Sequence, residues 1–529
     1  MGTRTVRDAT RELLRNLGLT TVFGNPGTTE IAFLTEWPDD FHYVLGLQES
    51  AVVAMADGYA QATRRPVLVN LHSAGGVGHS LGHVFTAYRN RTPLIVLAGQ
   101  QTRSLLPDEP FLGAVEAANF PKPYVKWSVE PARAQDVPAA IAHAHHVATQ
   151  APQGPVFVSV PVDDWDAEAT MPLPAGHRVP GFAPDPDALA ELVTALDEAR
   201  RPALVVGASV DQDGAVPDVV ALAEKLGAGV WAAPMSARCS FPEDHELFLG
   251  FLQPERIAVA EALRDHDLVV VLGAPAFTYH VYRGEPDRAL PPLYLVSDDE
   301  QVLARAGEGT GIRSTPGHAV RALTERVAVG ERTATGRPAP ADAPAETTPI
   351  SPAFAYSVVA ELLPENGIVV EETPSHRNVL HEQLPITATD TGFLTVASGT
   401  LGYGLPAAVG AALGRPDRKV VAVLGDGSSM YCVQALWTAA QQHVPVTFVV
   451  LDNEQYAAVR ILGETAGGRK VPGTALGGID FTTLAQSMGC SARTVKEAAE
   501  LRPALAAALA EEGPSLVHVK VDPNPQTLY

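Results

Sequence analysis

The sequence predicts an α/β protein of three domains, each a parallel sheet flanked by helices. Short apolar runs rich in β-branched residues alternate with helical segments, which is the pattern of βαβ units. The chain has 529 residues, whereas domains average about 150. Proline-rich segments near 175–187 and at 331–350 interrupt the alternation. We therefore expect domains at 1–180, 188–330 and 351–529, with 331–350 as a linker.

The first domain is predicted from segments that alternate in order along the chain. Residues 5–17 have the spacing of an amphipathic helix, and strands are expected at 21–23, 43–47, 67–71, 94–98 and 156–160. An alanine-rich helix is expected at 51–63. Glu49 follows the second strand and His72 follows the third. Because ligands of open parallel sheets bind at the carboxyl ends of strands, both side chains are candidate site residues.

The other two domains continue the pattern. The middle domain is expected to contain strands at 203–206, 229–232, 268–272 and 293–296. In the third domain, strands at 420–424 and 444–451 enclose a helix that Ser428 and Ser429 are expected to cap. This strand–helix–strand unit places Asp426 and Asn453 at one edge of the third sheet.

The pair formed by Asp426 and Asn453 has the chemistry of a magnesium site. A carboxylate, an amide oxygen and a backbone carbonyl near Gln455 are hard oxygen ligands, which Mg²⁺ and Ca²⁺ prefer. Gly425 and Gly427 would let the backbone approach a diphosphate, and the start of a helix favours an anion. A lone Gly-Asp-Gly is more often an ordinary turn at a strand end. Its connection to an asparagine through strand, helix and strand is far more specific.

Composition excludes several classes of function. The net charge of −22 argues against a nucleic-acid or anionic membrane surface. No stretch approaches the length of a membrane span, and the first residues lack the apolar segment of a signal peptide. The three cysteines, Cys239, Cys432 and Cys490, are scattered and form no metal-binding spacing. We expect a cytoplasmic protein without a disulfide framework or a zinc site.

Longer segments resemble those of the benzoylformate decarboxylases, which are thiamine diphosphate-dependent 2-oxo acid decarboxylases. The resemblance extends over nearly the full length and includes TVFGNPGTTE, LGLQES, NLHSAGGVGHSLG, GAPAFTYH and ASGTLGYGLPAAVG. It implies non-oxidative decarboxylation of an aryl 2-oxo acid to an aldehyde and CO₂, with thiamine diphosphate and Mg²⁺ or Ca²⁺ as cofactors. It also implies a homotetramer, a dimer of dimers, with active sites between chains.

The resemblance implies a role for several residues. Glu49 matches the glutamate that bonds the aminopyrimidine ring of the cofactor, and His72 and His280 match two histidines that transfer protons. Thr28 stands where the family has a serine that contacts the substrate carboxylate. The remaining cofactor contacts would come from Gly399, Leu401, Gly425, Asp426, Gly427, Ser428, Asn453 and Tyr456. The pair His145-His146 lies within an alanine-rich helix and is expected to be structural.

The substrate pocket departs from the family pattern. Leu462 and Thr395 stand where the family has phenylalanines, which would remove two aromatic contacts with a ring. A buried Arg377 would favour a substrate with a second polar or anionic group, whereas the alternative is a solvent-facing arginine paired with an acid. We expect an aryl 2-oxo acid with an altered preference. The predicted pocket consists of Pro26, Phe111, Leu112, Arg377, Thr395, Ala458 and Leu462.

Three other functions stay open at this point. A decarboxylase of another 2-oxo acid is the nearest alternative. A carboligase of the acetolactate synthase kind shares the fold and joins the cofactor-bound fragment to a second carbonyl. A non-catalytic scaffold is a different class, and the joint presence of Glu49, Asp426 and Asn453 argues against it.

Overall fold

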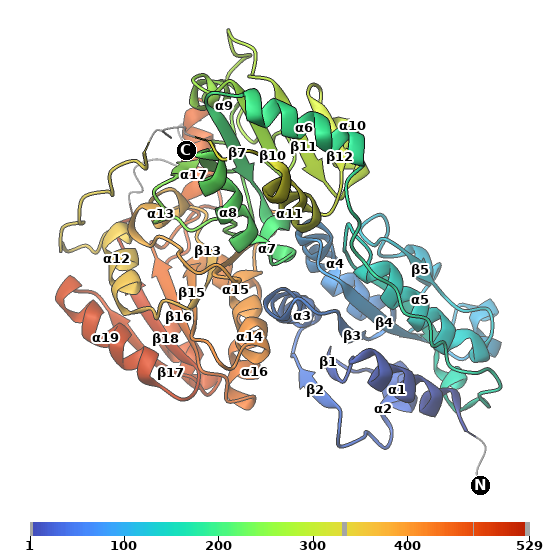
Figure 1. Cartoon of the computed structure of the whole chain (residues 1–529). Coiled ribbons are helices and arrows are strands. Elements are labelled where there is room, and N and C mark those ends of the chain that lie inside the picture. The colour runs from blue at the N-terminus through green and yellow to red at the C-terminus, as the bar shows by residue number, and fades with distance from the viewer. Residues whose placement is uncertain (1–3, 331–335, 469, 524–529) are drawn as a thin grey trace.

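The structure is a computed structural model that describes residues 4–330, 336–468 and 470–523, and it contains three six-stranded parallel sheets. Figure 1 shows them in succession from the blue N-terminal part through green to the red C-terminal part, each with helices on its faces. The predicted fold class is confirmed. None of the helices in these residues is long and apolar enough to cross a membrane.

The first sheet has the order β2-β1-β3-β4-β6-β5. Five of its strands were predicted, whereas β5 has only two residues and no apolar run to mark it. The elements are α1 (Val6–Leu17), β1 (Thr21–Gly24), α2 (Ile31–Leu34), β2 (His42–Leu45), α3 (Glu49–Thr63), β3 (Val67–Leu71), α4 (Ser73–Asn90), β4 (Leu94–Gln100), β5 (Ser128–Val129), α5 (Val137–Thr149) and β6 (Val156–Pro161).

The middle sheet has the order β12-β11-β10-β7-β8-β9. Its edge strands β9 and β12 were not predicted, because half-buried edge strands lack a continuous apolar run. The elements are α6 (Pro186–Glu198), β7 (Pro202–Val206), α7 (Ala208–Gln212), α8 (Val216–Leu226), β8 (Gly229–Ala232), β9 (Phe248–Phe251), α9 (Arg256–Leu263), β10 (Leu268–Leu272), β11 (Leu293–Ser297), α10 (Glu300–Arg305), β12 (Thr310–Arg313) and α11 (Pro316–Arg326).

The third sheet has the order β14-β13-β15-β16-β18-β17. Its elements are α12 (Pro352–Leu362), β13 (Ile368–Glu372), α13 (Leu380–Gln383), β14 (Phe393–Thr395), α14 (Gly404–Gly414), β15 (Val420–Gly425), α15 (Asp426–Tyr431), α16 (Ala435–Gln441), β16 (Val446–Asp452), α17 (Ala457–Thr465), α18 (Phe481–Ser487), β17 (Ser491–Val495), α19 (Ala498–Ala510) and β18 (Ser515–Lys520). The predicted cap was wrong: α15 begins at Asp426 with Gly425 as its N-cap, so Ser428 and Ser429 lie inside the helix.

Among the described residues, each strand lies within one predicted domain, whereas α6 begins at Pro186, before the predicted start of the middle domain; the boundaries themselves stay predictions. Of the predicted linker, residues 331–335 lie outside the described residues, and residues 336–349 form no helix or strand.

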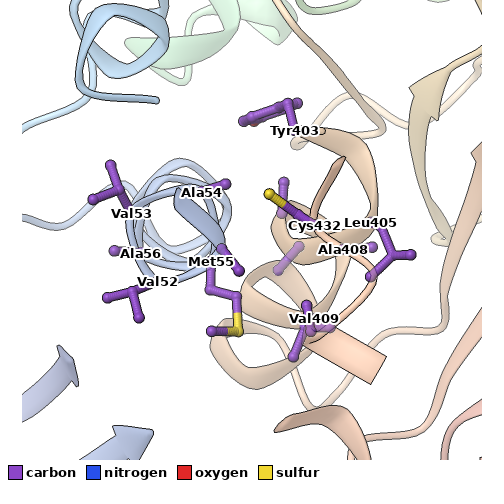
Figure 2. Close-up of a cluster of buried hydrophobic side chains, with 14 of the residues drawn as sticks. Val52, Val53, Ala54, Met55, Ala56, Tyr403, Leu405, Ala408, Val409 and Cys432 are labelled. Atoms are coloured by element: carbon purple, nitrogen blue, oxygen red, sulfur yellow. The ribbon is translucent and has the colours of Figure 1, made fainter. Parts of the chain in front are cut away.

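The first and third domains are joined by a close crossing of α3 and α14. A Cβ at Gly58 would lie 2.1 Å from the carbonyl oxygen of Ala407, and one at Gly410 would lie 1.8 Å from that of Met55. Glycine is therefore required at both positions for the helices to approach. Figure 2 shows Ala54 and Met55 on the side of α3 that faces α14, in a cluster of buried apolar side chains common to both domains.

A buried polar network links all three domains. Gln61 of α3 accepts a hydrogen bond from Arg238 of the middle domain at 2.8 Å. Arg238 forms an ion pair with Asp211 at 2.6 Å and donates to Thr391 of the third domain at 3.1 Å. Gln61 also donates to the fully buried Asp57 at 2.5 Å. Since each member is partnered, the network fixes the three domains relative to one another.

We expect Asp57→Asn to change how stability depends on pH. Burial raises the pKa of Asp57 from 3.8 to about 6, although hydrogen bonds from Gln61, Thr92 and Asn90 partly offset this. Because the folded state holds the proton more tightly, this group's contribution to stability is complete below about pH 4 and is lost as pH rises through about 6. The loss corresponds to about 3 kcal/mol.

The asparagine cannot ionise, so the variant should gain stability relative to the unsubstituted protein between pH 4 and 7. Denaturant midpoints measured for both proteins across this range test the prediction. A difference between the two proteins that does not vary with pH would contradict it.

Candidate active site

Asp426 and Asn453 lie at the same edge of the third sheet, as predicted. Strands β15 and β16 are parallel neighbours, and Gly425 is paired with Leu451, so Asp426 and Asn453 follow the two strands at adjoining ends. Each of the two side chains is only 4% exposed. The edge therefore presents a buried carboxylate and a buried amide close together.

One oxygen of Asp426 has no hydrogen-bond partner. Its Oδ1 accepts a hydrogen bond from the backbone N–H of Gly427 at 2.8 Å, while Oδ2 is buried and unsatisfied. Burial and the neighbouring Asp452 carboxylate together raise the pKa of Asp426 to about 7. A buried anionic oxygen without a donor is unfavourable unless a cation binds it, so the residue suits a metal ion.

The second carboxylate at this edge, Asp452, is already compensated. Its Oδ2 accepts from His518 Nε2 at 2.7 Å and from Lys520 Nζ at 2.6 Å, and its Oδ1 accepts from the N–H of Glu454 at 2.9 Å. Burial opposes ionisation, but these hydrogen bonds outweigh it and hold the pKa of Asp452 well below its usual range. Asp452 therefore stays ionised without a metal ion, unlike Asp426.

The amide of Asn453 is held from two sides. Its Nδ2 lies 3.3 Å from Nε2 of the buried His376, and its Oδ1 accepts the N–H of Gln455 at 3.2 Å. Burial lowers the pKa of His376 to about 4, so the ring is neutral and accepts this bond. The side chain of Gln455 accepts from Arg460 at 3.0 Å, which leaves its backbone carbonyl as the predicted ligand.

The backbone at the start of α15 packs closely against Tyr456. A Cβ at Gly427 would lie 2.3 Å from the ring of Tyr456, so only glycine fits beside that ring. Ser428 is buried in the first turn of α15. Helix starts bind anions, and the glycines allow close approach of a phosphate. These residues fit a cofactor diphosphate held through a divalent metal ion.

The loop that contains Gly399 and Leu401 is fixed by a buried acid. Gly399 has φ +75°, a left-handed conformation that favours glycine, and a Cβ there would meet no atom within 4 Å. Glu372 accepts hydrogen bonds from the N–H groups of Gly402 at 2.8 Å and Gly404 at 2.7 Å. Burial raises the pKa of Glu372 to about 8. This anchor was not found from the sequence, because nothing local marks it.

Glu49 stands at the corresponding edge of the first sheet. It is the first residue of α3 and is 9% exposed. Its Oε1 accepts from Asn25 Nδ2 at 3.2 Å, and its Oε2 lies 3.1 Å from Nδ1 of His79. Neither partner was predicted from the sequence, although Asn25 follows β1 directly and so lies at a strand end. The carboxylate is held in place with its outer part accessible.

His72, at the end of β3, is oriented by Glu30. Its Nδ1 lies 3.0 Å from Oε2 of Glu30 and 3.0 Å from Oγ1 of Thr29. Glu30 is 1% exposed and also accepts the N–H groups of Gly27 and Gly99. Since the hydroxyl of Thr29 donates to Glu30, Nδ1 of His72 carries the hydrogen. Nε2 is then the nitrogen that can exchange a proton with a ligand.

Comparisons with known proteins agree with this geometry. Models of the thiamine pyrophosphate enzymes match residues 4–119 (N-terminal TPP binding domain), 189–323 (central domain) and 375–519 (C-terminal TPP binding domain). A benzoylformate decarboxylase of Pseudomonas aeruginosa is 41% identical over 527 residues, 98% of each chain. The chain belongs to the benzoylformate decarboxylase family.

Two solved structures of this family are similar throughout. Benzoylformate decarboxylase of Polynucleobacter necessarius has a TM-score of 0.96 at 40% identity and covers 99% of each chain. A thiamine diphosphate-dependent 4-hydroxybenzoylformate decarboxylase of Rhodococcus jostii has a TM-score of 0.94 at 40% identity, over 99% of this chain and 100% of that one. The thiamine diphosphate fold is therefore established for the whole chain.

The predicted pocket residues of the first domain are exposed in the single chain. Phe111 is 87% exposed and Leu112 is 37% exposed, while Pro26 and Thr28 also lie at the surface. The backbone beneath Phe111 is nevertheless held, because its carbonyl accepts from Gln101 and that of Leu112 accepts from Ser73, next to His72. The ring of Phe111 itself is exposed to solvent.

Arg377 is half-buried and paired with an acid. It lies 2.7 Å from Oε2 of Glu371 and donates to Thr395 Oγ1 at 2.8 Å. Although burial opposes ionisation, Arg377 and hydrogen bonds from Thr373 and Thr395 lower the pKa of Glu371. Of the two alternatives, the structure favours an arginine paired with an acid, because Glu371 balances the charge of Arg377, and a preference for a second anionic group on the substrate stays a prediction. Thr395 is 3% exposed, and its hydroxyl bonds Glu371.

The other predicted residues lie on three different elements. Ala458 and Leu462 are in α17, where Leu462 is 43% exposed and the N–H of Ala458 donates to Ser375. His280 is exposed in the segment 273–292 after β10, and its N–H donates to the carbonyl of Pro254 at 2.9 Å. The pair His145-His146 lies in α5, away from a strand end, as predicted.

Within one chain, the two halves of the candidate site are not joined. The hydrogen bonds of Glu49 go to the first domain, and those of Asp426 and Asn453 stay in the third. In the described ranges of residues, no hydrogen bond or ion pair links Glu49 to either of them.

Proposed function

We propose that this protein is a thiamine diphosphate- and Mg²⁺-dependent decarboxylase that converts an aryl 2-oxo acid to an aldehyde and CO₂. One observation carries the proposal: the unsatisfied buried oxygen of Asp426 lies beside Asn453 at a glycine-lined helix start. That arrangement fits a diphosphate bridged by a metal ion, and the full-length likeness to benzoylformate decarboxylases supports the reaction.

The residues of the third domain would hold the cofactor. Asp426, Asn453 and the carbonyl of Gln455 would bind the metal, and Gly425, Gly427, Ser428 and Tyr456 would surround the diphosphate. Leu401 would support the cofactor from below. The carbonyl of Gly399 would accept a hydrogen bond from the amino group of the cofactor. When bound, thiamine diphosphate supplies an electron sink for the bond to the leaving carboxylate.

The residues of the first domain would move protons and position the substrate. Glu49 would exchange a proton with the aminopyrimidine ring, for which its buried but accessible carboxylate is suited. His72 would present Nε2 to the substrate, because Glu30 holds its other nitrogen. Thr28 would contact the substrate carboxylate, and His280 would serve in a second proton transfer.

We propose that the complete site forms between two copies of the chain, in a homotetramer built as a dimer of dimers. Glu49 and the metal edge are not linked within one chain, so a partner would bring them together. Large apolar side chains on the elements of the site are exposed and would be covered, namely Leu47, Phe111, Val115, Tyr431, Val459 and Leu462. The buried free thiols fit a reducing, cytoplasmic location.

We expect measurable decarboxylation of benzoylformate, with substituted or aliphatic 2-oxo acids competing well. Leu462 replaces an aromatic pocket residue of the family, and each lost ring contact removes about 0.5–1.5 kcal/mol. The measurement is kcat/KM for benzoylformate, 4-hydroxybenzoylformate, pyruvate, branched 2-oxo acids and 2-oxoglutarate, with CO₂ and aldehyde both quantified.

A variant tests the pocket assignment directly. Leu462→Phe should raise kcat/KM for benzoylformate relative to pyruvate, by roughly twofold to tenfold from one restored ring contact. Product analysis with an added aldehyde would reveal a carboligase. Failure to turn over any aryl 2-oxo acid would refute the proposed substrate class while leaving cofactor binding in place.

A further inference from the structure

A cysteine, a glutamate and a histidine meet where the middle domain contacts the third domain. Cys239 and Glu243 lie in the segment after β8, and His381 lies in α13. One ligand atom of each falls within 4.8 Å of the others. Sγ of Cys239 donates to Oε1 of Glu243 at 3.0 Å, and Nδ1 of His381 lies 3.0 Å from the same oxygen. We propose that these three residues bind a zinc ion.

The chemical nature of the three ligand atoms determines which metal ion they favour. A thiolate, an imidazole and a carboxylate form a borderline-soft set, which Zn²⁺ favours and Mg²⁺ does not. Around a tetrahedral zinc ion with bonds of about 2.0–2.3 Å, neighbouring ligand atoms lie about 3.3–3.6 Å apart. The present contacts would need to open by a few tenths of an ångström. Solvent can supply a fourth ligand, because the side chain of His381 is 15% exposed.

Charge balance supports a dication at this place. Glu243 is 3% exposed, and within residues 4–330, 336–468 and 470–523 no lysine or arginine forms an ion pair with it. When zinc replaces the thiol proton and the ring hydrogen of His381 moves from Nδ1 to Nε2, the ring stays neutral, and the thiolate and the carboxylate offset the two positive charges of the metal. The buried complex then carries no net charge, which removes the main electrostatic penalty of burial.

The surroundings hold the three ligands in position. The ring of His381 packs against Phe251 at 4.3 Å and Phe393 at 5.0 Å between centroids. The N–H of Glu243 donates to the carbonyl of Ile386 of the third domain at 3.0 Å. Zinc bound here would link the middle domain to the third domain. Its ligands are different residues from those of the proposed magnesium site.

The same residues do not suit a cysteine nucleophile. Cys239 is only 8% exposed, and its thiol faces the carboxylate and not the histidine. Burial and the charge of Glu243 raise its pKa well above the usual value. A reactive cysteine needs an accessible thiolate beside a positive group, whereas a metal ion removes the thiol proton by direct coordination.

The test uses the full-length holoenzyme with thiamine diphosphate and excess Mg²⁺. After incubation with Zn²⁺ and dialysis, we expect one zinc ion per chain by elemental analysis. Cys239→Ser and His381→Gln should each lower the retained zinc at least about tenfold. Cys490→Ser is the matched control and should retain zinc, because it removes a buried thiol outside the cluster, one that donates to the carbonyl of Leu436 at 3.4 Å.

Cobalt provides an independent readout of sulfur ligation. Co²⁺ in place of Zn²⁺ should produce a thiolate-to-cobalt charge-transfer band in the unsubstituted protein and in Cys490→Ser. The band should be absent from Cys239→Ser. If Cys239→Ser does not fold, the zinc content of His381→Gln alone tests whether the cluster binds zinc. Zinc retention at the control level in that variant, or no band in the unsubstituted protein, would overturn the proposal.

Discussion

Asp426→Ala is expected to abolish metal-dependent binding of thiamine diphosphate. The substitution removes a buried carboxylate oxygen at the third sheet edge for which no described residue is a hydrogen-bond donor. Loss even of a residue that only supports a metal ligand weakens affinity 10–100-fold, so loss of a ligand should exceed about 100-fold. Calorimetric titration of thiamine diphosphate with and without Mg²⁺ measures this, with circular dichroism to verify the fold.

The neighbouring strand end offers a matched control. Asp452→Asn also removes one buried carboxylate from this edge, but Asp452 is already bonded by His518 and Lys520 and is not a proposed ligand. The asparagine keeps an acceptor oxygen for the N–H of Glu454. We expect this variant to retain metal-dependent binding. Equal affinities in Asp426→Ala and the unsubstituted protein would remove Asp426 from the metal site.

Glu49→Gln is expected to preserve the fold and lose most of the turnover. Glutamine has the same shape and can still bond Asn25 and His79, which lie 3.2 and 3.1 Å from the carboxylate. It cannot exchange a proton, and a positioned acid–base group contributes roughly 10²–10⁴-fold to the rate. The measurements are kcat with saturating cofactor and hydrogen–deuterium exchange at the thiazolium carbon of the bound cofactor, which should slow in parallel.

A control variant at the start of another helix distinguishes a catalytic role of Glu49 from a role in helix stability. Glu300 occupies the first position of α10, as Glu49 does in α3, so Glu300→Gln removes a comparable favourable interaction with a helix dipole. We expect this control to leave kcat and exchange unchanged. If Glu49→Gln behaves like Glu300→Gln, then Glu49 stabilises α3 and has no part in proton transfer.

Periodicity and strand-end position were sufficient for much of the fold and for the common sheet edge of Asp426 and Asn453. Strands β3, β8 and β10 have the predicted bounds, because short buried apolar runs between polar or glycine residues leave few alternatives. Asp426 and Asn453 were placed together correctly because neighbouring parallel strands joined by a helical crossover, here α15 and α16, end at the same edge. The likeness of whole segments added the cofactor and the reaction, which periodicity cannot supply.

The tertiary structure alone decided which charges are balanced and by what. Glu371 neutralises Arg377, His518 and Lys520 hold Asp452 ionised, and Glu30 sets the orientation of His72. Cys239 and His381 approach one another only because the segment after β8 docks on the third domain. A pKa, a tautomer or a metal site depends on atoms a few ångströms apart, and residues far apart in sequence acquire such neighbours only when the chain is packed.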